Sequence, residues 1–349
     1  STAGVQALDT EDIAVLTTLQ IARLTSAQVG ALTTAQIIAL GSDGIVAIET
    51  ADIAAFTTAQ VQGLTTDQIT TLTTAQLVAL TTASIAAIAT DDLAALTTAQ
   101  IAGLTTVQIP ALTTTQIVAL GTESVAAIKT ADIAALTTAQ VAAMTTEQVT
   151  ALTTAQIAAI KIAGIRAIET ADFAALSSEQ MTSLTTAQMA VITTAQIVAL
   201  TTEQIASLTT AQLVALKTTN IAVLETTDLV VLTTEQIAAL TTAQVAALTT
   251  AQLVAMGTDQ IVAIETADIK AFTTTQIAGL TTDQVSILTT AQLTALETAS
   301  VQAIQTADIA ALTTDQITSL TTAQVAGLTT AQVVALSTGQ ITSLTTAQL

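Results

Sequence analysis

The chain has 349 residues, of which 51% are hydrophobic, and its 6 Lys+Arg and 26 Asp+Glu give a formal net charge of −20. This charge excludes the basic surface that nucleic acids and anionic membranes require, and the absence of His and Cys excludes His-based catalytic triads, disulfides and thiolate metal sites. Mean hydropathy is high, at +0.71. Polar Thr and Gln nevertheless return every eight residues, so we expect no membrane insertion. From the net charge we expect no nucleic-acid partner.

From Ser1 onward the chain repeats one eight-residue unit without a slip in frame. It contains 43 complete octads, which cover residues 1–344, and the partial octad Thr345–Leu349. A typical unit is Thr233–Leu240, TTEQIAAL. Position 5 is always Val, Ile, Leu, Met or Phe, position 8 is always Leu, Ile, Met or Phe, and Ile162 is the one exception to Thr or Ser at position 2. We therefore predict a single continuous repeat array over residues 1–349, since a disordered chain has no reason to keep this phase.

Each octad is predicted to form one short helix. In a continuous α-helix, positions 5 and 8 would drift around the cylinder by about 80° per octad, and in a continuous strand they would point to alternating sides. Thr at position 1 and Gln at position 4 have the spacing of a capping box, and Ala, Gln and Leu favour helix. The predicted fold class is an all-α solenoid of very short helices. A β-solenoid is the alternative, because Thr, Ile and Val favour strands, although most octads lack the residues of sharp β-turns.

One octad cannot be stable alone. It buries about two large side chains, at roughly 1.5–3 kcal/mol each. Ordering its eight backbone units costs on the order of 8–16 kcal/mol. Stacking of neighbouring octads must supply the difference, which is how a solenoid is stabilised.

A second period of 40 residues is superimposed on the octads. Certain octads begin with a residue other than Thr and carry Asp at position 4, as in Glu49–Phe56 and Lys129–Leu136. These aspartates are Asp12, Asp52, Asp92, Asp132, Asp172, Asp228, Asp268 and Asp308, spaced by 40 residues except for 56 between the fifth and sixth. The octad before each often has Gly, Ser or Asn at position 4, as at Gly44, Ser84 and Asn220. Three explanations are open: duplication of a 40-residue unit, a superhelical turn of five octads that would stack the aspartates in a column, or a kink at each such pair of octads.

Pro110 occupies position 6, inside one predicted helix. Proline lacks the amide hydrogen that this position would donate, so we expect a local defect there.

Repetition of the polar residues predicts architecture and not catalysis, so we predict that the protein is not an enzyme and needs no cofactor. The eight aspartates are candidate Ca²⁺ ligands if they form a column, because Ca²⁺ prefers carboxylate oxygens. Helix capping or exposure to solvent explains them more simply, and no metal site is assigned. The array of Thr hydroxyls and methyls is likewise a candidate ice-binding face, or simply a series of N-caps.

The run Leu-Thr-Thr-Ala-Gln-Ile-Ala-Ala-Leu resembles repeat arrays of very long bacterial secreted or cell-surface proteins, and the resemblance covers the whole chain. Leu240–Val245, LTTAQV, is also similar to the first helix of TAL effector repeats, but the second helix and the base-reading loop are missing. The first resemblance implies an extended extracellular role without catalytic residues. We expect an extracellular or cell-surface fibre segment whose partner is another copy or a flanking repeat, with a ligand-binding surface or a passive adhesin stalk as alternatives.

Overall fold

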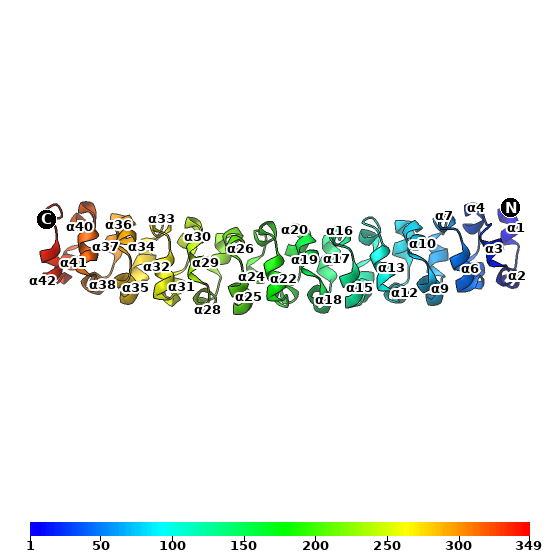
Figure 1. The fold of residues 1–349 in the computed structure, drawn as a ribbon, viewed down its shortest axis with the longest axis horizontal. Helices are drawn as coiled ribbons and strands as arrows, with labels where there is room; N and C mark the ends of the chain where they lie inside the picture. Colours follow the sequence, from blue (N-terminus) through cyan, green and yellow to red (C-terminus); the bar gives the residue numbers. More distant parts are fainter. The chain divides into compact units, whose positions relative to one another are not determined.

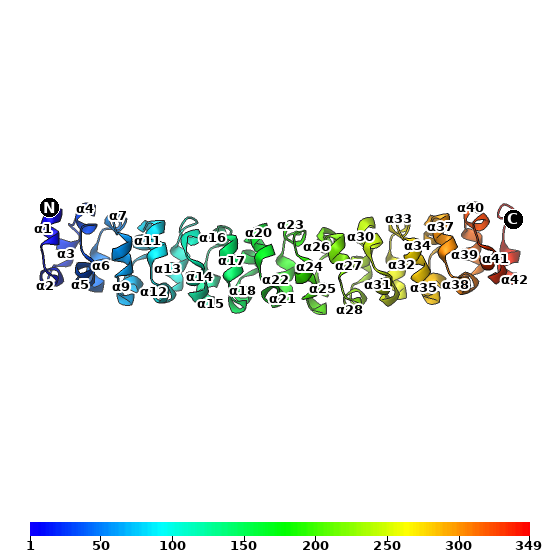
Figure 2. The same cartoon turned by 180° about the vertical axis from the view of Figure 1, so that it is seen from behind.

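The computed structural model describes all 349 residues as 42 α-helices and one 3₁₀-helix, with no strand. The prediction of an all-α solenoid of short helices is confirmed, and the β-solenoid alternative is wrong. The chain divides into two compact units, unit 1 (Ser1–Leu176) and unit 2 (Ser177–Leu349), which we describe separately. Figure 1 and Figure 2 show the two sides of each.

The elements of unit 1 are α1 (Thr2–Gln6), α2 (Thr10–Ala14), α3 (Thr18–Ile21), α4 (Ser26–Val29), α5 (Thr34–Ala39), α6 (Gly41–Ala47), α7 (Thr50–Ile53), α8 (Thr58–Gln62), α9 (Thr66–Thr71), α10 (Thr74–Ala79), α11 (Thr82–Ala87), α12 (Thr90–Ala94), α13 (Thr98–Gly103), η1 (Ile109–Ala111), α14 (Thr114–Ala119), α15 (Thr122–Ala127), α16 (Thr130–Ile133), α17 (Thr138–Ala143), α18 (Thr146–Ala151), α19 (Thr154–Ala159), α20 (Ile162–Ala167) and α21 (Thr170–Ala174).

The elements of unit 2 are α22 (Ser178–Ser183), α23 (Thr186–Met189), α24 (Thr194–Val198), α25 (Thr202–Ser207), α26 (Thr210–Ala215), α27 (Thr218–Ala222), α28 (Thr226–Val230), α29 (Thr234–Ala238), α30 (Thr242–Ala247), α31 (Thr250–Ala255), α32 (Thr258–Ala263), α33 (Thr266–Ile269), α34 (Thr274–Gly279), α35 (Thr282–Ser286), α36 (Thr290–Ala295), α37 (Thr298–Ala303), α38 (Thr306–Ala311), α39 (Thr314–Ser319), α40 (Thr322–Ala326), α41 (Thr330–Ala335) and α42 (Thr338–Ser343).

Helix α10 shows how one octad folds. Thr73 is its N-cap in an extended conformation, and its hydroxyl accepts from the amide of Gln76 while the Gln76 side chain accepts from the amide of Thr73. Leu80 follows the helix with φ −62° and ψ 141°, and Thr81, the next N-cap, is also extended, so two extended residues turn the chain at this octad junction. A helix of six residues is too short to persist alone, and the reciprocal cap satisfies amides that its first turn leaves open. The predicted capping box is confirmed.

The octads of each unit wind around a common core. Within a unit, each helix packs on the third element before it and the third after it, with η1 counted as one element. The side chains at positions 5 and 8 fill the interior; Leu77 and Ile85, for example, are fully buried. Side chains also hydrogen-bond to groups 25 to 31 residues away. One turn therefore takes between three and four octads, and the hypothesis of five octads per turn is wrong.

The octad that contains Pro110 is the only complete octad without an α-helix. It forms the 3₁₀-helix η1, with the proline in its first turn. The expected defect is confirmed, but it is local, because Ile109 and Leu112 remain buried and Gln108 still bonds to Leu77 and Leu80 of an earlier turn.

Gly41 is the only residue with a positive φ, at 66°. Leu40, just before it, is helical and not extended, so α5 passes into α6 with a different junction from that of the other octads. At the other special octads the residue before the helix is extended, as at Lys161 and Lys217. The hypothesis of a backbone kink at every such pair therefore does not hold.

Candidate functional site

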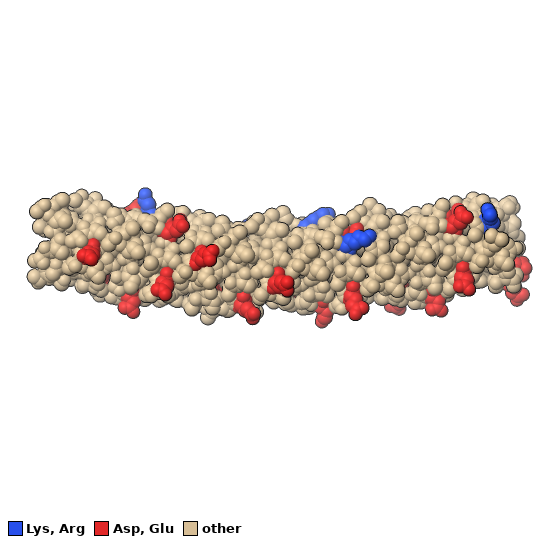
Figure 3. Space-filling view, viewed as in Figure 1, with Lys and Arg blue, Asp and Glu red and all other residues tan.

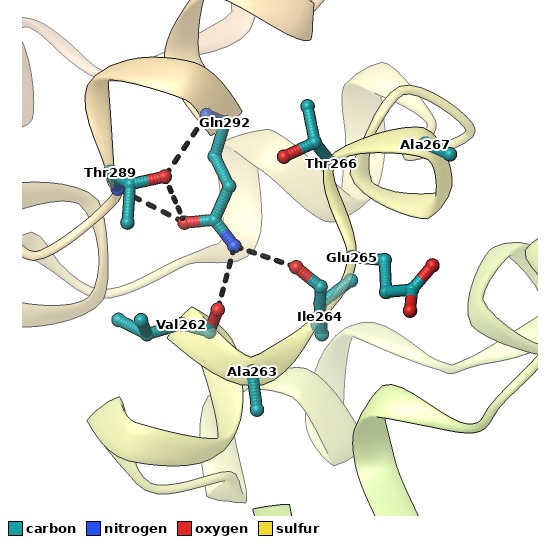
Figure 4. A pocket seen from close by; sticks show the side chains of 8 residues that line it. All are labelled: Val262, Ala263, Ile264, Glu265, Thr266, Ala267, Thr289 and Gln292. Carbon is teal, nitrogen blue, oxygen red and sulfur yellow. Dashed lines mark hydrogen bonds between the residues drawn. The ribbon is translucent and has the colours of Figure 1, made fainter. Parts of the chain in front are cut away.

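The glutamine at position 4 is the main polar link between successive turns. Gln292 accepts through Oε1 from the Thr289 amide at 3.0 Å, which completes the capping box. Its Nε2 donates to the main-chain oxygens of Val262 at 3.2 Å and Ile264 at 2.8 Å, in the turn before (Figure 4). One side chain thus caps its own helix and also binds the end of an earlier one, whose last carbonyls have no partner inside that helix.

We call the position-4 glutamines that donate to an earlier turn the glutamine ladder. Its members in unit 1 are Gln36, Gln60, Gln68, Gln76, Gln100, Gln108, Gln116, Gln140, Gln148 and Gln156. Its members in unit 2 are Gln212, Gln236, Gln244, Gln252, Gln260, Gln276, Gln284, Gln292, Gln316, Gln324, Gln332, Gln340 and Gln348. The bonds span 28, 30 or 31 residues, and no buried side-chain nitrogen or oxygen lacks a partner.

Sequence reasoning found the capping role of these glutamines but missed their link to the earlier turn. A signal was present. Glutamate serves a capping box as well as glutamine does, yet no octad has Glu at position 4. A carboxylate only accepts hydrogen bonds, whereas the amide also has two donors. The use of Gln and never Glu at position 4 therefore indicated that the side-chain nitrogen of Gln has a hydrogen-bond partner of its own.

Six of the eight position-4 aspartates make the link in the opposite direction. Each of the six accepts at Oδ1 from a Thr or Ser hydroxyl at position 2, 26 residues earlier. The distances are 2.5 Å for Ser26–Asp52, Thr146–Asp172 and Thr242–Asp268, 2.6 Å for Thr66–Asp92 and Thr282–Asp308, and 3.1 Å for Thr202–Asp228. All six of these aspartates are buried. They therefore connect stacked octads within a unit.

The two remaining aspartates differ. Asp12 is exposed and takes part in a capping box with Asp9. Asp132 is buried but accepts no hydroxyl, because the octad where its donor would lie is the distorted one with Pro110. Burial raises the pKa of the Asp132 carboxyl above its ordinary value, and the charge of Lys129 opposes this shift in part.

The structure does not bring the eight candidate Ca²⁺ ligands together. Stacked octads are three or four apart, whereas the aspartates recur every five octads, so successive aspartates lie on different sides of the coil. No three acidic side chains come close enough to hold a metal ion. The buried aspartates act as acceptors for hydroxyls, which explains them without a ligand.

The octad before each aspartate also varies at position 4. Asn220 donates to the Ile192 oxygen at 3.0 Å, as a ladder glutamine does, and Ser84 reaches the Phe56 oxygen at 3.3 Å. At Gly164 a Cβ would lie 3.3 Å from a methyl of Val141, which packs there from the earlier turn. Close packing therefore replaces the polar link at the glycine.

The threonine hydroxyls at position 1 are already engaged. Thr57 accepts from the Gln60 amide, and its hydroxyl also lies 3.2 Å from Gln60 Oε1. A shallow hollow lies beside Gln292, but the side-chain amide of Gln292 is already hydrogen-bonded. The carboxylate of Glu265 points away from that amide (Figure 4). Neither feature resembles a built binding site.

None of the helices has the length and apolar character that crossing a membrane requires. No curated protein shows a significant match to the sequence. The ALTTAQ repeat matches at residues 5–42, 45–82, 85–122, 125–161, 165–202, 194–225, 221–258, 261–298 and 301–338, which together cover most of the chain. Successive matches begin 40 residues apart, except between 165 and 221, where the extra match lies. The chain therefore belongs to the ALTTAQ repeat family.

Proposed function

We propose that this structural repeat protein forms part of an extracellular or cell-surface fibre in which arrays join end to end. The observation that carries the proposal is that the glutamine ladder joins each turn to the one before it through main-chain oxygens, which every octad possesses. The link therefore sets no limit to the number of turns. Another turn of octads, from a second copy or from flanking repeats, would continue the glutamine ladder unchanged.

Burial of the position-5 side chains also depends on a following turn. Val333 and Ile341 occupy position 5 but are 46% and 44% exposed, whereas Val301 and Ile309 at the same position one turn earlier are fully buried. Covering an aliphatic side chain stabilises an assembly by about 25 cal/mol per Å² of apolar surface. A contact that pairs the same surfaces repeatedly without closing produces a filament.

The other candidate functions have less support. The position-1 hydroxyls serve as caps, which leaves them poorly placed to match an ice lattice, and no acidic group converges for Ca²⁺. A passive stalk would use the same array without contact between its ends. Membership of a repeat family and the solenoid fold favour a structural role over a catalytic one. Location outside the cell is proposed from the resemblance to secreted and surface arrays, and protease treatment of intact cells tests it.

Sedimentation velocity and negative-stain microscopy of residues 1–349 test the assembly. We expect particles that lengthen as the protein concentration rises. Val333→Glu places a charge on the exposed apolar end and should abolish the lengthening. Val118→Glu is the matched control, because Val118 is 43% exposed but lies in the middle of unit 1. Single particles at every concentration, or equal effects of both substitutions, would contradict end-to-end assembly.

A further inference from the structure

A row of exposed carboxylates follows one side of each unit. All are at octad position 3 and all are exposed. We call them the carboxylate row: Glu11, Asp43, Asp67, Asp91, Glu123 and Glu147 in unit 1, and Glu179, Glu203, Glu235, Asp259, Asp283 and Asp315 in unit 2. No other octad has an acidic residue at position 3.

The spacing of the row follows the superhelical turn. Neighbouring members within a unit are 24 or 32 residues apart, that is, three or four octads. The side-chain bonds that join one turn to the next span 25 to 31 residues. Each turn therefore contributes one carboxylate, and in each unit these carboxylates lie on the same side.

Duplication of the 40-residue unit does not explain the row. Asp43 and Glu123 belong to it, but Ala83 occupies the equivalent place in the copy between them. Conversely, Asp91 has Ala51 as its equivalent one copy earlier. The acidic residues have thus changed place among the copies in a way that keeps them on one side of the coil.

Five of the six cationic residues lie away from the row. Arg23, Lys161, Arg166, Lys217 and Lys270 come 11 to 19 residues after the preceding row member, which is about half a turn. In Figure 3 most carboxylates of each unit gather toward one edge, and Lys and Arg lie toward the other. The sixth, Lys129, comes six residues after Glu123 and is the one positive charge near the row, so most of the row has none to neutralise it.

The surface between these charges would otherwise favour association. It consists mainly of Thr and Ala, with aliphatic side chains such as Val46 and Val262, which come three residues after Asp43 and Asp259 and are 44% and 39% exposed. Exposed apolar patches promote contact between molecules. If two copies met along their rows, the shared spacing would place each carboxylate opposite another. Stacked helices are separated by about 8–10 Å and the Debye length is about 8 Å at physiological salt, so each turn would contribute its own repulsion.

We propose that the carboxylate row keeps this side of the array free of contact with other copies, so that copies join at their ends and not along the row. This inference rests on the proposed end-to-end assembly. The two can be separated, because end contacts determine the length of an assembly and lateral contacts determine its width.

Two variants with the same composition test the inference. The row variant carries Glu123→Gln, Glu147→Gln, Glu179→Gln, Glu203→Gln and Glu235→Gln. The control variant carries five Glu→Gln substitutions at position 1, at Glu49, Glu169, Glu225, Glu265 and Glu297. Both reduce the net charge from −20 to −15. Width and length are measured by negative-stain microscopy, and circular dichroism and thermal unfolding check that each variant folds.

We expect the row variant to form wider, laterally associated particles at physiological salt, while the control variant keeps the width of the parent. Equal widening of both, or of neither, would overturn the inference and would leave the end-to-end proposal untouched. If the row variant fails to fold, the parent protein gives a second test. Raising NaCl screens the row and should widen the parent particles, whereas unchanged width up to about 1 M, where the Debye length is about 3 Å, would overturn the inference.

Discussion

Gln octads and Asp octads place a buried polar side chain at the same point of the coil but join the turns in opposite directions. Gln76 donates to the backbone oxygens of Ile45 and Ile48, which any octad possesses. Asp92 accepts from the hydroxyl of Thr66, which requires a particular side chain 26 residues earlier. The glutamine link therefore tolerates any neighbour, whereas the aspartate link requires a specific one. Repetition of the glutamine link gives the array its length. The aspartate link, which in most of the array recurs every five octads, adds a contact between two specific side chains.

The largest expected effect on stability comes from replacing the position-4 glutamine of a Gln octad with a carboxylic acid. Gln76→Glu keeps the capping acceptor but removes the donors and places a carboxylate against three backbone oxygens. We expect the local free energy of opening to fall by roughly 3–5 kcal/mol, because buried carbonyls lose their partner and a charge is buried beside them. Hydrogen exchange of the amides in α6 and α10 measures this.

Asp92→Asn is the matched control for that comparison. The amide can still accept from Thr66 and gains a donor that can reach an earlier carbonyl, as Asn220 does at Ile192. We expect a change below about 1 kcal/mol. If Gln76→Glu lowers the free energy of opening no more than Asp92→Asn does, then the Gln octads and the Asp octads do not differ in the direction of their hydrogen bonds.

The next effect isolates the specific neighbour that an aspartate requires. Thr66→Val removes the hydroxyl that donates to Asp92 and leaves a buried carboxylate with one bond fewer. We expect the free energy of unfolding to fall by about 1.5–3 kcal/mol, the range for hydrogen bonds to charged groups. Thr114→Val is the control, since Thr114 has the same octad position but its hydroxyl bonds to no side chain. A similar loss in both variants, measured by urea unfolding, would show that the hydroxyl–carboxylate bond is not responsible.

The octad helix and its cap could be predicted because their information is local. Thr at position 1, Gln at position 4 and large apolar residues at positions 5 and 8 lie within one unit, and the structure of α10 follows from them. The defect at Pro110 was predictable for the same reason, since one missing amide hydrogen affects only its own helix.

The turn of the coil could not be predicted from the octad alone. It depends on how Gln60 meets Val29 and Leu32 of an earlier turn, and a periodic sequence does not state that distance. The strong 40-residue period suggested five octads per turn, but it records which octads carry aspartate and not how they stack. The spacing of the position-3 acids, 24 or 32 residues, is the feature of the sequence that matches the turn.

Asp132 allows buried aspartates with and without a hydroxyl donor to be compared, because it is buried and has no such donor. Burial raises the pKa of its carboxyl above the ordinary 3.8, so the ionised form destabilises the fold. A raised acid pKa means that this cost is absent below about pH 3.8 and develops as pH rises through the folded-state pKa. Asp132→Asn should therefore stabilise the protein by about 1 kcal/mol at pH 7 and by nothing at pH 3. Asp172→Asn, where Thr146 donates to the carboxylate, should show no such gain, and thermal unfolding at both pH values checks this.

The smallest effect concerns the N-terminal side-chain cap that α12, the helix of one Asp octad, lacks. Ala89 precedes α12 with φ −62° and ψ 147°, an extended conformation that suits an N-cap, but it has no side-chain cap and is exposed. Ala89→Thr should add the bond that Thr73 makes in α10 and raise the free energy of unfolding by about 0.5–1 kcal/mol. Gly257→Thr, in a Gln octad with the same backbone conformation, should gain only a few tenths, because Gly is already nearly as good an N-cap as Thr. If thermal unfolding shows no gain for Ala89→Thr, then Asp at position 4 is incompatible with a threonine cap, and this would explain why no Asp octad begins with Thr.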